Sequence, residues 1–473
     1  MRITYGLFFI FLFLIFPPQS KGLPLSESNI NDQVSISVAI YNNNLALVNE
    51  IRRIEIPSPD GELSFIGIPA HIIPESVLVR SIDNEREFTI VEQNYEYDLL
   101  NQDSMLDKYV GEKIKIVDWN KYKDRKEVTE AILLSNKGGQ IYKIGSEIYI
   151  GHPGYKVLPG LPEGLTERPT LKWVYESCGS KSPYDLSVCY LTKNISWNSD
   201  YILILGEDEV SADISGKVTI NNKSGADFND AALRLVAGEI HQTESTFGER
   251  LYAKRDIKVS PGDQFREQAF FEYHVYDLQK KTTIKDRQAK QINLFQARGL
   301  KVDKELVVYG NNGYFTKRLI GQNIRQPVNV YIKLKNSKEN NLGIPFPAGI
   351  IRLYKVSNHE GLLFVGEGRI QHIPQEEEVK IHAGEAFDVF AERTQTGYKQ
   401  TTTRLYESTW EIILRNHKEK DVRVGVVEPL SGNWSVVSST HTFRKIDAFT
   451  IRFDVQIPKE EEVKIRYTAE VGL

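Results

Sequence analysis

The stretch FFEYHVYDLQKKTTIKDRQAKQINLF, residues 270–295, decides the fold class of this chain. Aromatic residues crowd its first part at Phe270, Phe271, Tyr273 and Tyr276, and polar and apolar residues alternate over residues 291–294. Aromatic enrichment and a period of two are both typical of β-strands. The stretch therefore predicts two strands joined by a short polar crossing. No catalytic group stands out between them, so we interpret the stretch as the structural centre of an all-β protein.

The same alternation recurs along most of the chain. Residues 34–41 alternate at a period of two, and three asparagines at 42–44 supply a turn. In residues 449–457 the apolar side chains fall on one face and the polar ones on the other. One-sided burial of this kind is typical of antiparallel sheets that pack face to face. The pattern predicts an all-β fold of several antiparallel β-sandwich, immunoglobulin-like domains.

One segment near residues 99–110 departs from the strand pattern. Its apolar residues recur at helical spacing, and Gly111 is a typical helix end. We predict one short helix here, with an apolar face made of Leu99, Leu100, Met105, Leu106, Tyr109 and Val110.

The N-terminus has the features of a secretory signal peptide. Arg2 precedes an uncharged apolar run over residues 5–16, and small and polar residues follow up to Gly22. The run is shorter than the roughly 20 residues that a transmembrane helix needs. We predict that residues 1–22 are cleaved, and that the mature chain is periplasmic or extracellular and has no membrane span. The alternative is that the segment stays in place as an anchor.

The chain has two cysteines, Cys178 and Cys189, on either side of a loop rich in Gly, Ser, Pro and Asp. In an oxidising compartment these two residues are expected to form a disulfide that closes the loop. A pair of reduced thiols is the alternative. Their spacing and number do not fit a metal site.

Composition and turn residues suggest how the 473 residues divide. We expect an N-terminal β domain over residues 31–207, a middle β segment over 208–300 and a C-terminal β-sandwich region over 301–473. Alternatively, residues 208–473 form one composite domain.

Charge and motifs narrow the possible functions. The net charge of −4 argues against a nucleic-acid partner, which requires a basic excess. No nucleophile elbow, zinc-protease motif or phosphate-binding loop is present, so no cofactor, metal or catalytic residue is assigned. The closest histidines, His372 and His382, flank Glu376–Glu378, which we interpret as solvated turn charges. A carboxylate pair for glycoside hydrolysis converges only in space and stays open.

Several stretches resemble a family of bacterial exported β-proteins of unknown function. The C-terminal domain of this family also occurs in mucoidy-inhibitor-like proteins. The resemblance implies a β-rich envelope protein and supplies no catalytic residues; the long coiled coil of the mucoidy-inhibitor type is not readable here. The matching stretches are YNNNLALV at 41–48, VEQNYEYDLL at 91–100, DKYVG at 107–111, LTERPTL at 165–171, SWNSDY at 196–201, LRLVAG at 233–238, TTIKD at 282–286, KQI at 290–292 and GEAFDV at 384–389.

These observations together predict an exported cell-envelope protein that serves as a binding or scaffolding module. Its expected partner is an envelope protein or a polysaccharide. One alternative is a hydrolase of envelope polysaccharide that uses two carboxylates in a groove. A second alternative is a structural component that pairs with its partner through edge strands, which an uncovered and uncharged edge strand would favour.

Overall fold

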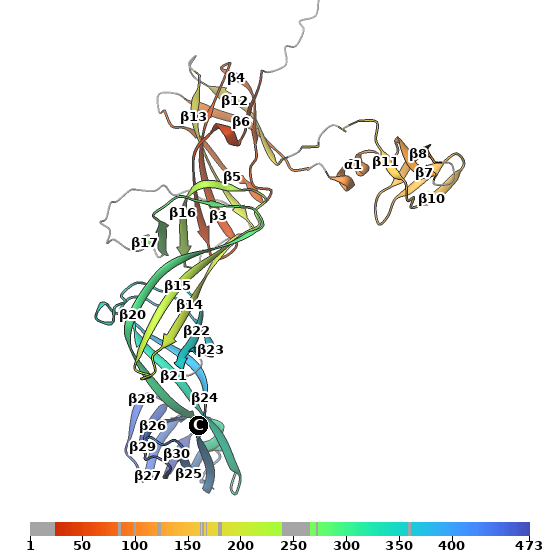
Figure 1. Cartoon of the computed structure of the whole chain (residues 1–473). Coiled ribbons are helices and arrows are strands. Elements are labelled where there is room, and N and C mark those ends of the chain that lie inside the picture. Colours follow the sequence, from red (N-terminus) through yellow and green to blue (C-terminus); the bar gives the residue numbers. More distant parts are fainter. Residues whose placement is uncertain are drawn as a thin grey trace, which may run out of the picture. The chain divides into compact units, whose positions relative to one another are not determined.

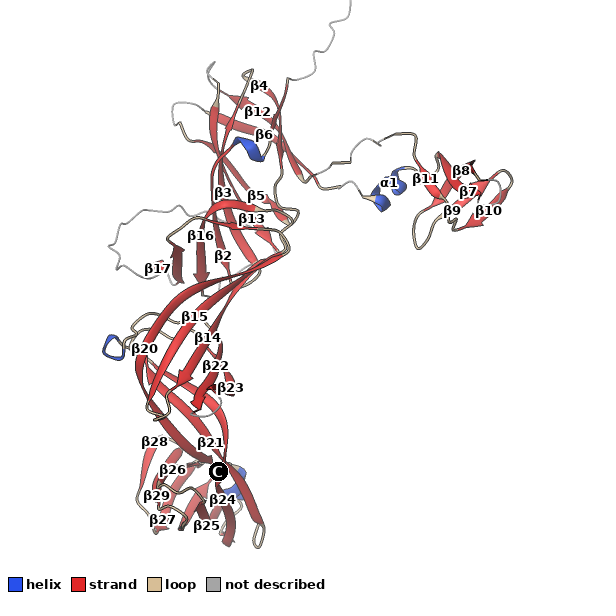
Figure 2. Cartoon of the chain, viewed as in Figure 1, coloured by secondary structure: helices blue, strands red, loops and turns tan. Residues whose placement is uncertain are grey.

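The computed structural model describes residues 24–473 (Figure 1), except for 84–86, 99–100, 121–123, 161, 163–164, 167, 178–181, 239–264, 271–272 and 358–360. The expected signal peptide at residues 1–22 lies outside the described residues. Strands dominate the rest of the chain (Figure 2), which confirms the predicted all-β class. The chain divides into two compact units, which are residues 1–36 with 48–192, and residues 37–47 with 193–473. Strands β2 (Gln33–Tyr41) and β3 (Leu45–Ile54) run from one unit into the other.

The first unit is built around a four-stranded sheet in the order β1-β4-β12-β6. Trp173 and Tyr175 of β12 are fully buried and alternate with the more exposed Lys172, Val174 and Glu176. The Trp173 ring lies 5.0 Å from that of Phe65, and the Tyr175 ring stacks on Phe88 at 5.1 Å. Strand β5 (Ile72–Ser81) pairs with β13 (Tyr184–Lys193) in the same unit. The sheet strands are β1 (Leu25–Ser28), β4 (Asp60–Ile66), β6 (Phe88–Glu96) and β12 (Thr170–Ser177), and a 3-10 turn, η1, covers Ile30–Asp32.

A smaller five-stranded sheet, in the order β10-β9-β8-β7-β11, also belongs to the first unit. The predicted helix is confirmed as α1 (Gln102–Lys108), although residues 99–100 lie outside the described part. It begins at Asn101, whose side chain accepts a hydrogen bond from the Ser104 N–H and so caps the helix. Leu106 of α1 packs with Ile114 and Tyr142 in the core of this sheet. The strands are β7 (Lys113–Asn120), β8 (Arg125–Ser135), β9 (Ile141–Ile144), β10 (Glu147–Ile150) and β11 (Tyr155–Val157).

The stretch that decides the fold class lies in the second unit and contains more strands than predicted. Residues 265–309 form four strands instead of two: β17 (Phe265–Phe270), β18 (Tyr273–Leu278), β19 (Thr282–Ile284) and β20 (Gln288–Tyr309). Strand β18 pairs with β16 and β17, whereas β20 pairs with β15, β21 and β26. β20 is 22 residues long, which lets it pair with β15, β21 and β26 along its length. This strand continues through residues 300 and 301, where the sequence analysis expects the middle segment to end and the C-terminal region to begin.

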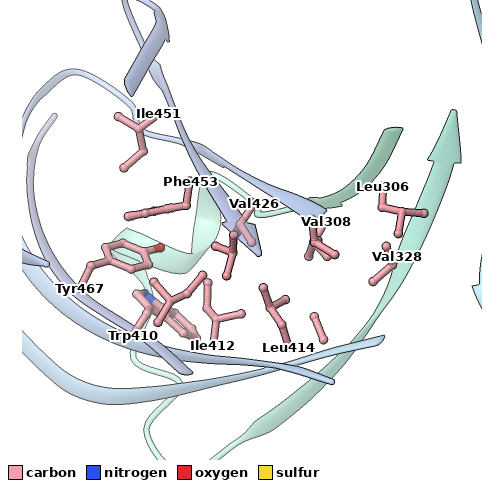
Figure 3. Packing of buried hydrophobic residues seen from close by; sticks show 14 of the residues in the cluster. Leu306, Val308, Val328, Trp410, Ile412, Leu414, Val426, Ile451, Phe453 and Tyr467 are labelled. Carbon is pink, nitrogen blue, oxygen red and sulfur yellow. The ribbon is translucent and has the colours of Figure 1, made fainter. Parts of the chain in front are cut away.

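The second unit ends in two packed layers with a large apolar core. Trp410 and Ile412 of β25 and Tyr467 of β30 meet Val426 of β26 and Phe453 of β29 (Figure 3). Each of these side chains is fully buried. Those on β25, β29 and β30 alternate with more exposed neighbours, as the sequence pattern predicts, whereas the neighbours of Val426 on β26 are buried too. A short helix that the sequence analysis did not predict, α2 (Gly313–Thr316), contributes Phe315 to the same core.

The pairing is mostly antiparallel, as predicted, with parallel pairs at β1–β4, β2–β16, β14–β22 and β20–β26. The remaining elements of the second unit are β14 (Ile195–Leu205), β15 (Ser211–Asn222), β16 (Phe228–Ala237), β21 (Asn323–Lys335), the 3-10 turn η2 (Lys338–Asn340), β22 (Gly349–Ser357), β23 (Gly361–Ile370), β24 (Glu378–Gln400), β25 (Leu405–Asn416), β26 (Val422–Pro429), β27 (Asn433–Ser439), β28 (Phe443–Asp447), β29 (Thr450–Ile457) and β30 (Glu462–Gly472).

Gly349 begins the parallel pair between β22 and β14, where no side chain fits. A Cβ atom at this position would overlap the backbone carbonyl of Ser199 on β14. We expect Gly349→Ala to lower the free energy of unfolding by about 1–3 kcal/mol, because the strands must separate to admit the methyl group. The matched control is Gly368→Ala on β23, where the nearest atom lies at an ordinary 3.7 Å. Urea unfolding of both variants tests this; equal losses would contradict the steric explanation.

Candidate binding surfaces

The predicted disulfide involves one residue outside the described part of the chain, Cys178. Cys189 lies on β13 opposite Leu78, and it forms no disulfide within the described residues. Burial raises the pKa of its thiol, and the nearby Arg80 partly offsets this effect. The pairing of Cys178 with Cys189 stays a prediction.

The two histidines nearest in sequence have separate partners. Nδ1 of His372 accepts a hydrogen bond from the backbone N–H of Ala348 at 3.2 Å. Nε2 of His382 lies 3.2 Å from Oδ1 of Asn329, and its ring lies 5.1 Å from that of Tyr331. Across the described residues, no group of three or more His, Cys, Asp or Glu side chains is placed to hold a metal ion.

Two pockets in the described structure bear on the hydrolase alternative. One, of about 170 Å³, lies on β14, β15 and β20 and is lined by one carboxylate, Asp213. The other, of about 930 Å³, lies between α1 and the β11 segment, where Met105, Leu106 and Tyr155 contribute to its wall. No carboxylate lines this second pocket. Neither pocket therefore brings together the two carboxylates that glycoside hydrolysis requires.

Each unit contains a fully buried arginine paired with a buried glutamate. In the first unit Arg52 Nε lies 3.0 Å from Glu50, and Tyr190 donates a hydrogen bond to the same carboxylate at 3.0 Å. In the second unit Arg393 donates hydrogen bonds from both terminal nitrogens to Glu428. Burying charges of this kind is costly unless they are paired, so we assign both clusters a structural role.

A cluster of lysines surrounds Glu209 at the turn between β14 and β15. The Lys304 and Lys355 ammonium groups lie 2.9 Å and 2.5 Å from its carboxylate oxygens, and Lys420 lies at 3.4 Å. Burial alone would raise the pKa of Glu209, but the hydrogen bonds from Lys304 and Lys355 outweigh it and lower the pKa to about 2. The cluster connects the turn to β20, β22 and the loop after β25.

This shift predicts a pH dependence of stability. A carboxyl group with a depressed pKa stabilises the folded chain above its ordinary pKa of 4.5 and loses that contribution as the pH falls towards 2. We expect Glu209→Gln to cost about 1 kcal/mol at neutral pH, after allowance for solvent screening, and to flatten the stability profile between these two pH values. Urea unfolding at a series of pH values tests this. The control is Glu385→Gln on β24; a wild-type slope in Glu209→Gln would contradict the assignment.

The five-stranded sheet has one covered face and one exposed face. Ile114, Ile116, Leu133 and Tyr142 point to the covered side, where Leu106 of α1 packs on them. Alternate residues point to the other side. The strand register defines this second side, which we call the outer face. It consists of Lys113, Lys115, Val117 and Trp119 of β7, Lys126, Val128, Glu130 and Ile132 of β8, Ile141 and Lys143 of β9, Ile148 and Ile150 of β10, and Tyr155 and Val157 of β11.

Large apolar side chains of the outer face are exposed to solvent. The exposed fraction is 88% for Ile150, 66% for Ile148, 81% for Tyr155 and 61% for Trp119. Single exposed apolar residues are ordinary on protein surfaces, but a contiguous group of them marks an interaction site. Ile148 and Ile150 lie on the edge strand β10, Trp119 and Tyr155 lie on β7 and β11 at the other side of the sheet order, and Val128 on β8, 53% exposed, lies between them. The outer face therefore exposes large apolar side chains on four of its five strands.

The charge of the outer face is one-sided. The register places Lys113, Lys115, Lys126 and Lys143 on it, against the single carboxylate of Glu130. Within the described part of the chain, no carboxylate lies within ion-pair distance of these four lysines. The outer face therefore combines apolar and cationic character and fits a partner that is apolar and anionic.

A second exposed apolar segment lies on the edge strand β23 of the second unit. Leu362, Leu363, Phe364 and Val365 are all exposed and carry no charge. β23 ends the strand order of its sheet and pairs along one side with β22. An edge of this kind can accept a further strand.

One known protein family matches more than half of this chain. Residues 186–472 match the family described as Domain of unknown function (DUF4139). The chain belongs to this family. The matched region begins within β13 and includes β14 to β30, so it holds the edge strand β23, whereas the outer face lies before it. No curated protein matches the chain significantly. Within the described residues, no helix is both long and apolar enough to cross a membrane.

The sequence analysis did not single out the outer face. The alternation of Lys113 and Lys115 with Ile114 and Ile116 was readable as a strand, but it does not reveal which side is covered. The signal that could have found the face is the repetition of apolar residues at both sets of alternating positions, as in residues 147–150.

Proposed function

We propose that this member of the DUF4139 family is an exported binding module of the cell envelope and that it binds through the outer face. The proposal rests on the exposed side chains of Trp119, Ile148, Ile150 and Tyr155, which all lie on one sheet face that also carries four lysines. The apolar N-terminal run supports export to the periplasm or beyond. In line with the resemblance noted above, we place the C-terminal domain with those of mucoidy-inhibitor-like proteins.

The physical reason is the cost of leaving this surface in water. Exposed apolar area gains free energy when a partner covers it, by about 25 cal/mol for each Å² removed from water. The lysines restrict which partner can cover this apolar area, because an uncharged partner would leave the lysine charges unpaired. A specific envelope component with anionic groups meets both conditions.

Cross-linking in intact cells tests this function. The tagged chain is compared with the variant I148S/I150S, in which two exposed side chains of the outer face become polar. We expect a reproducible envelope component to cross-link to the parent chain and to be lost from the variant. The matched control, L362S/L363S, makes the same kind of change on β23 and should retain the cross-link. Equal recovery from the parent and I148S/I150S would overturn the outer face as the binding surface.

The edge strand β23 supports a second candidate function, that of a structural component paired through strand addition. Its exposed residues 362–365 carry no charge that would oppose an added strand, whereas Glu367 and Arg369 follow further along β23. A charge placed on the edge, as in Leu363→Lys, would oppose such pairing. Loss of the cross-link from L362S/L363S and its retention in I148S/I150S would favour this function over the first.

A further inference from the structure

We propose that the occupant of the outer face is the surface of an anionic phospholipid bilayer. This inference rests on the proposed function, because it names the partner of the same surface. The partner is recognised by two properties together, an apolar layer and a layer of phosphate groups above it. The outer face offers groups suited to each layer.

The apolar groups of the outer face have the size and position to enter the boundary between headgroups and acyl chains. Ile148 and Ile150 lie on the edge strand β10, and both are more than half exposed. Trp119 and Tyr155 lie on β7 and β11, on the opposite side of the sheet order. Tryptophan and tyrosine are the residues that favour the interface between membrane and water, where their rings are apolar and their polar atoms stay hydrated.

The lysines match the phosphate layer better than they match a protein partner. The register alternates them with apolar residues: Lys143 lies between Ile148 and Ile132, and Lys126 lies opposite Trp119. At the centre of a protein interface each ammonium group would lose its water, which is why lysine is depleted there. At a bilayer the flexible side chain lays its methylene groups on the apolar surface and extends its charge to the phosphates.

The aliphatic residues argue against an anionic polysaccharide as the first choice. A hydrated polymer would pair with the lysines but would leave the branched side chains of Ile148 and Ile150 in contact with water. A bilayer surface covers them, and such burial adds to the electrostatic attraction for anionic lipids. Salt screens the attraction between the exposed lysines and the lipid phosphates, so binding should weaken as the ionic strength rises.

The test is co-sedimentation of the full chain with two kinds of vesicle. One is phosphatidylcholine alone, and the other is an equimolar mixture of phosphatidylcholine and phosphatidylglycerol. All variants keep the same N-terminus, so any contribution of the apolar run over residues 5–16 is common to them. We expect the parent chain to bind the mixed vesicles more tightly than the neutral ones.

Two variants of the outer face should weaken this binding. K113E/K115E/K143E should reduce the partition coefficient by more than about 100-fold, since losing each lysine near an anionic surface removes roughly a factor of five and each added glutamate is repelled by the phosphates. I148S/I150S should reduce it on the order of tenfold, because less apolar area is buried. The matched controls are K280E/K285E/K301E, which makes the same charge change at exposed lysines of the second unit, and L362S/L363S on β23. Both controls should bind like the parent.

Three outcomes would overturn the bilayer as partner. They are no binding of the parent chain to mixed vesicles, equal binding by the outer-face variants, and complete competition by inorganic phosphate, which would indicate a site for a single phosphate group. If one of these is found while I148S/I150S still loses its cellular cross-link, the proposed function stands and the partner is an anionic protein or polysaccharide. If I148S/I150S keeps its cross-link as well, the proposed function fails together with the inference.

Discussion

Replacing Glu428 by glutamine is expected to lower the free energy of unfolding of the second unit by about 3–5 kcal/mol. The change leaves the guanidinium of Arg393 fully buried without its counter-charge. Burial tends to lower the pKa of Arg393, but the Glu428 carboxylate outweighs it and raises the pKa above the ordinary value. In the parent chain Arg393 is therefore charged and solvated by the carboxylate, and the glutamine variant removes that solvation from the buried guanidinium. The loss should be measured by urea unfolding.

The surroundings of Arg393 explain why no other group can replace the carboxylate. Its Nε donates to Oε1 of Gln326 at 3.0 Å, and a terminal nitrogen donates to the Tyr467 hydroxyl at 3.4 Å. The rings of Tyr314 and Trp410 lie on its flanks, at 5.1 Å and 5.4 Å from the guanidinium carbon. The double variant R393M/E428L removes both charges and should regain most of the stability, since apolar replacement of a buried pair is often neutral. A double variant no more stable than Glu428→Gln would contradict this explanation.

Replacing Arg52 by leucine is expected to cost the first unit about 3–5 kcal/mol for the same reason. Arg52 lies over the ring of Phe65 at 3.6 Å and donates to the carbonyl oxygens of Ser28 and Ile66 at 3.3 Å and 2.9 Å. Without it, the buried Glu50 carboxylate loses its counter-charge and keeps the hydrogen bond from Tyr190. Burial, together with the charge of Glu50, raises the pKa of Tyr190 well above its ordinary value, so this tyrosine remains a neutral donor.

The adjacent Arg53 is the matched control. It lies on the same strand but faces solvent, and it pairs with Asp185 at 2.8 Å and 2.9 Å. An exposed ion pair contributes little to stability, so Arg53→Leu should leave the unfolding transition nearly unchanged. Equal losses at Arg52 and Arg53 would show that burial does not decide the effect.

Local patterns predicted much of the fold, because alternation is a property of each strand alone. The predicted strand over residues 449–457 is β29 (Thr450–Ile457), and the predicted helix is α1. The strand partners were not predictable, because pairing joins residues far apart in sequence. The deciding stretch shows this: β18 pairs with β16, and β20 pairs with β15, β21 and β26. An alternation of period two shows which residues of a strand share a face, but it does not show which strands lie beside that strand.

The candidate surfaces were harder to predict for the same reason. Arg393 and Glu428 are polar residues on different strands, and no pattern in the sequence indicates that they meet in a core. The exposure of Ile148 and Ile150 depends on which side of the sheet α1 covers, and that choice is made by packing. The domain boundaries expected at residues 207 and 300 and the pairing of Cys178 with Cys189 stay predictions, as does cleavage of the signal peptide.

The most direct measurement of binding through the outer face is photo-cross-linking in intact cells from single positions. A photoreactive residue is placed at Val128 on the outer face, at Leu363 on β23, or at Lys280 in the second unit. We predict that Val128 yields a reproducible adduct with an envelope component, and that Lys280 and Leu363 do not. Adducts of equal yield at all three positions, or an adduct at Leu363 alone, would contradict binding through the outer face.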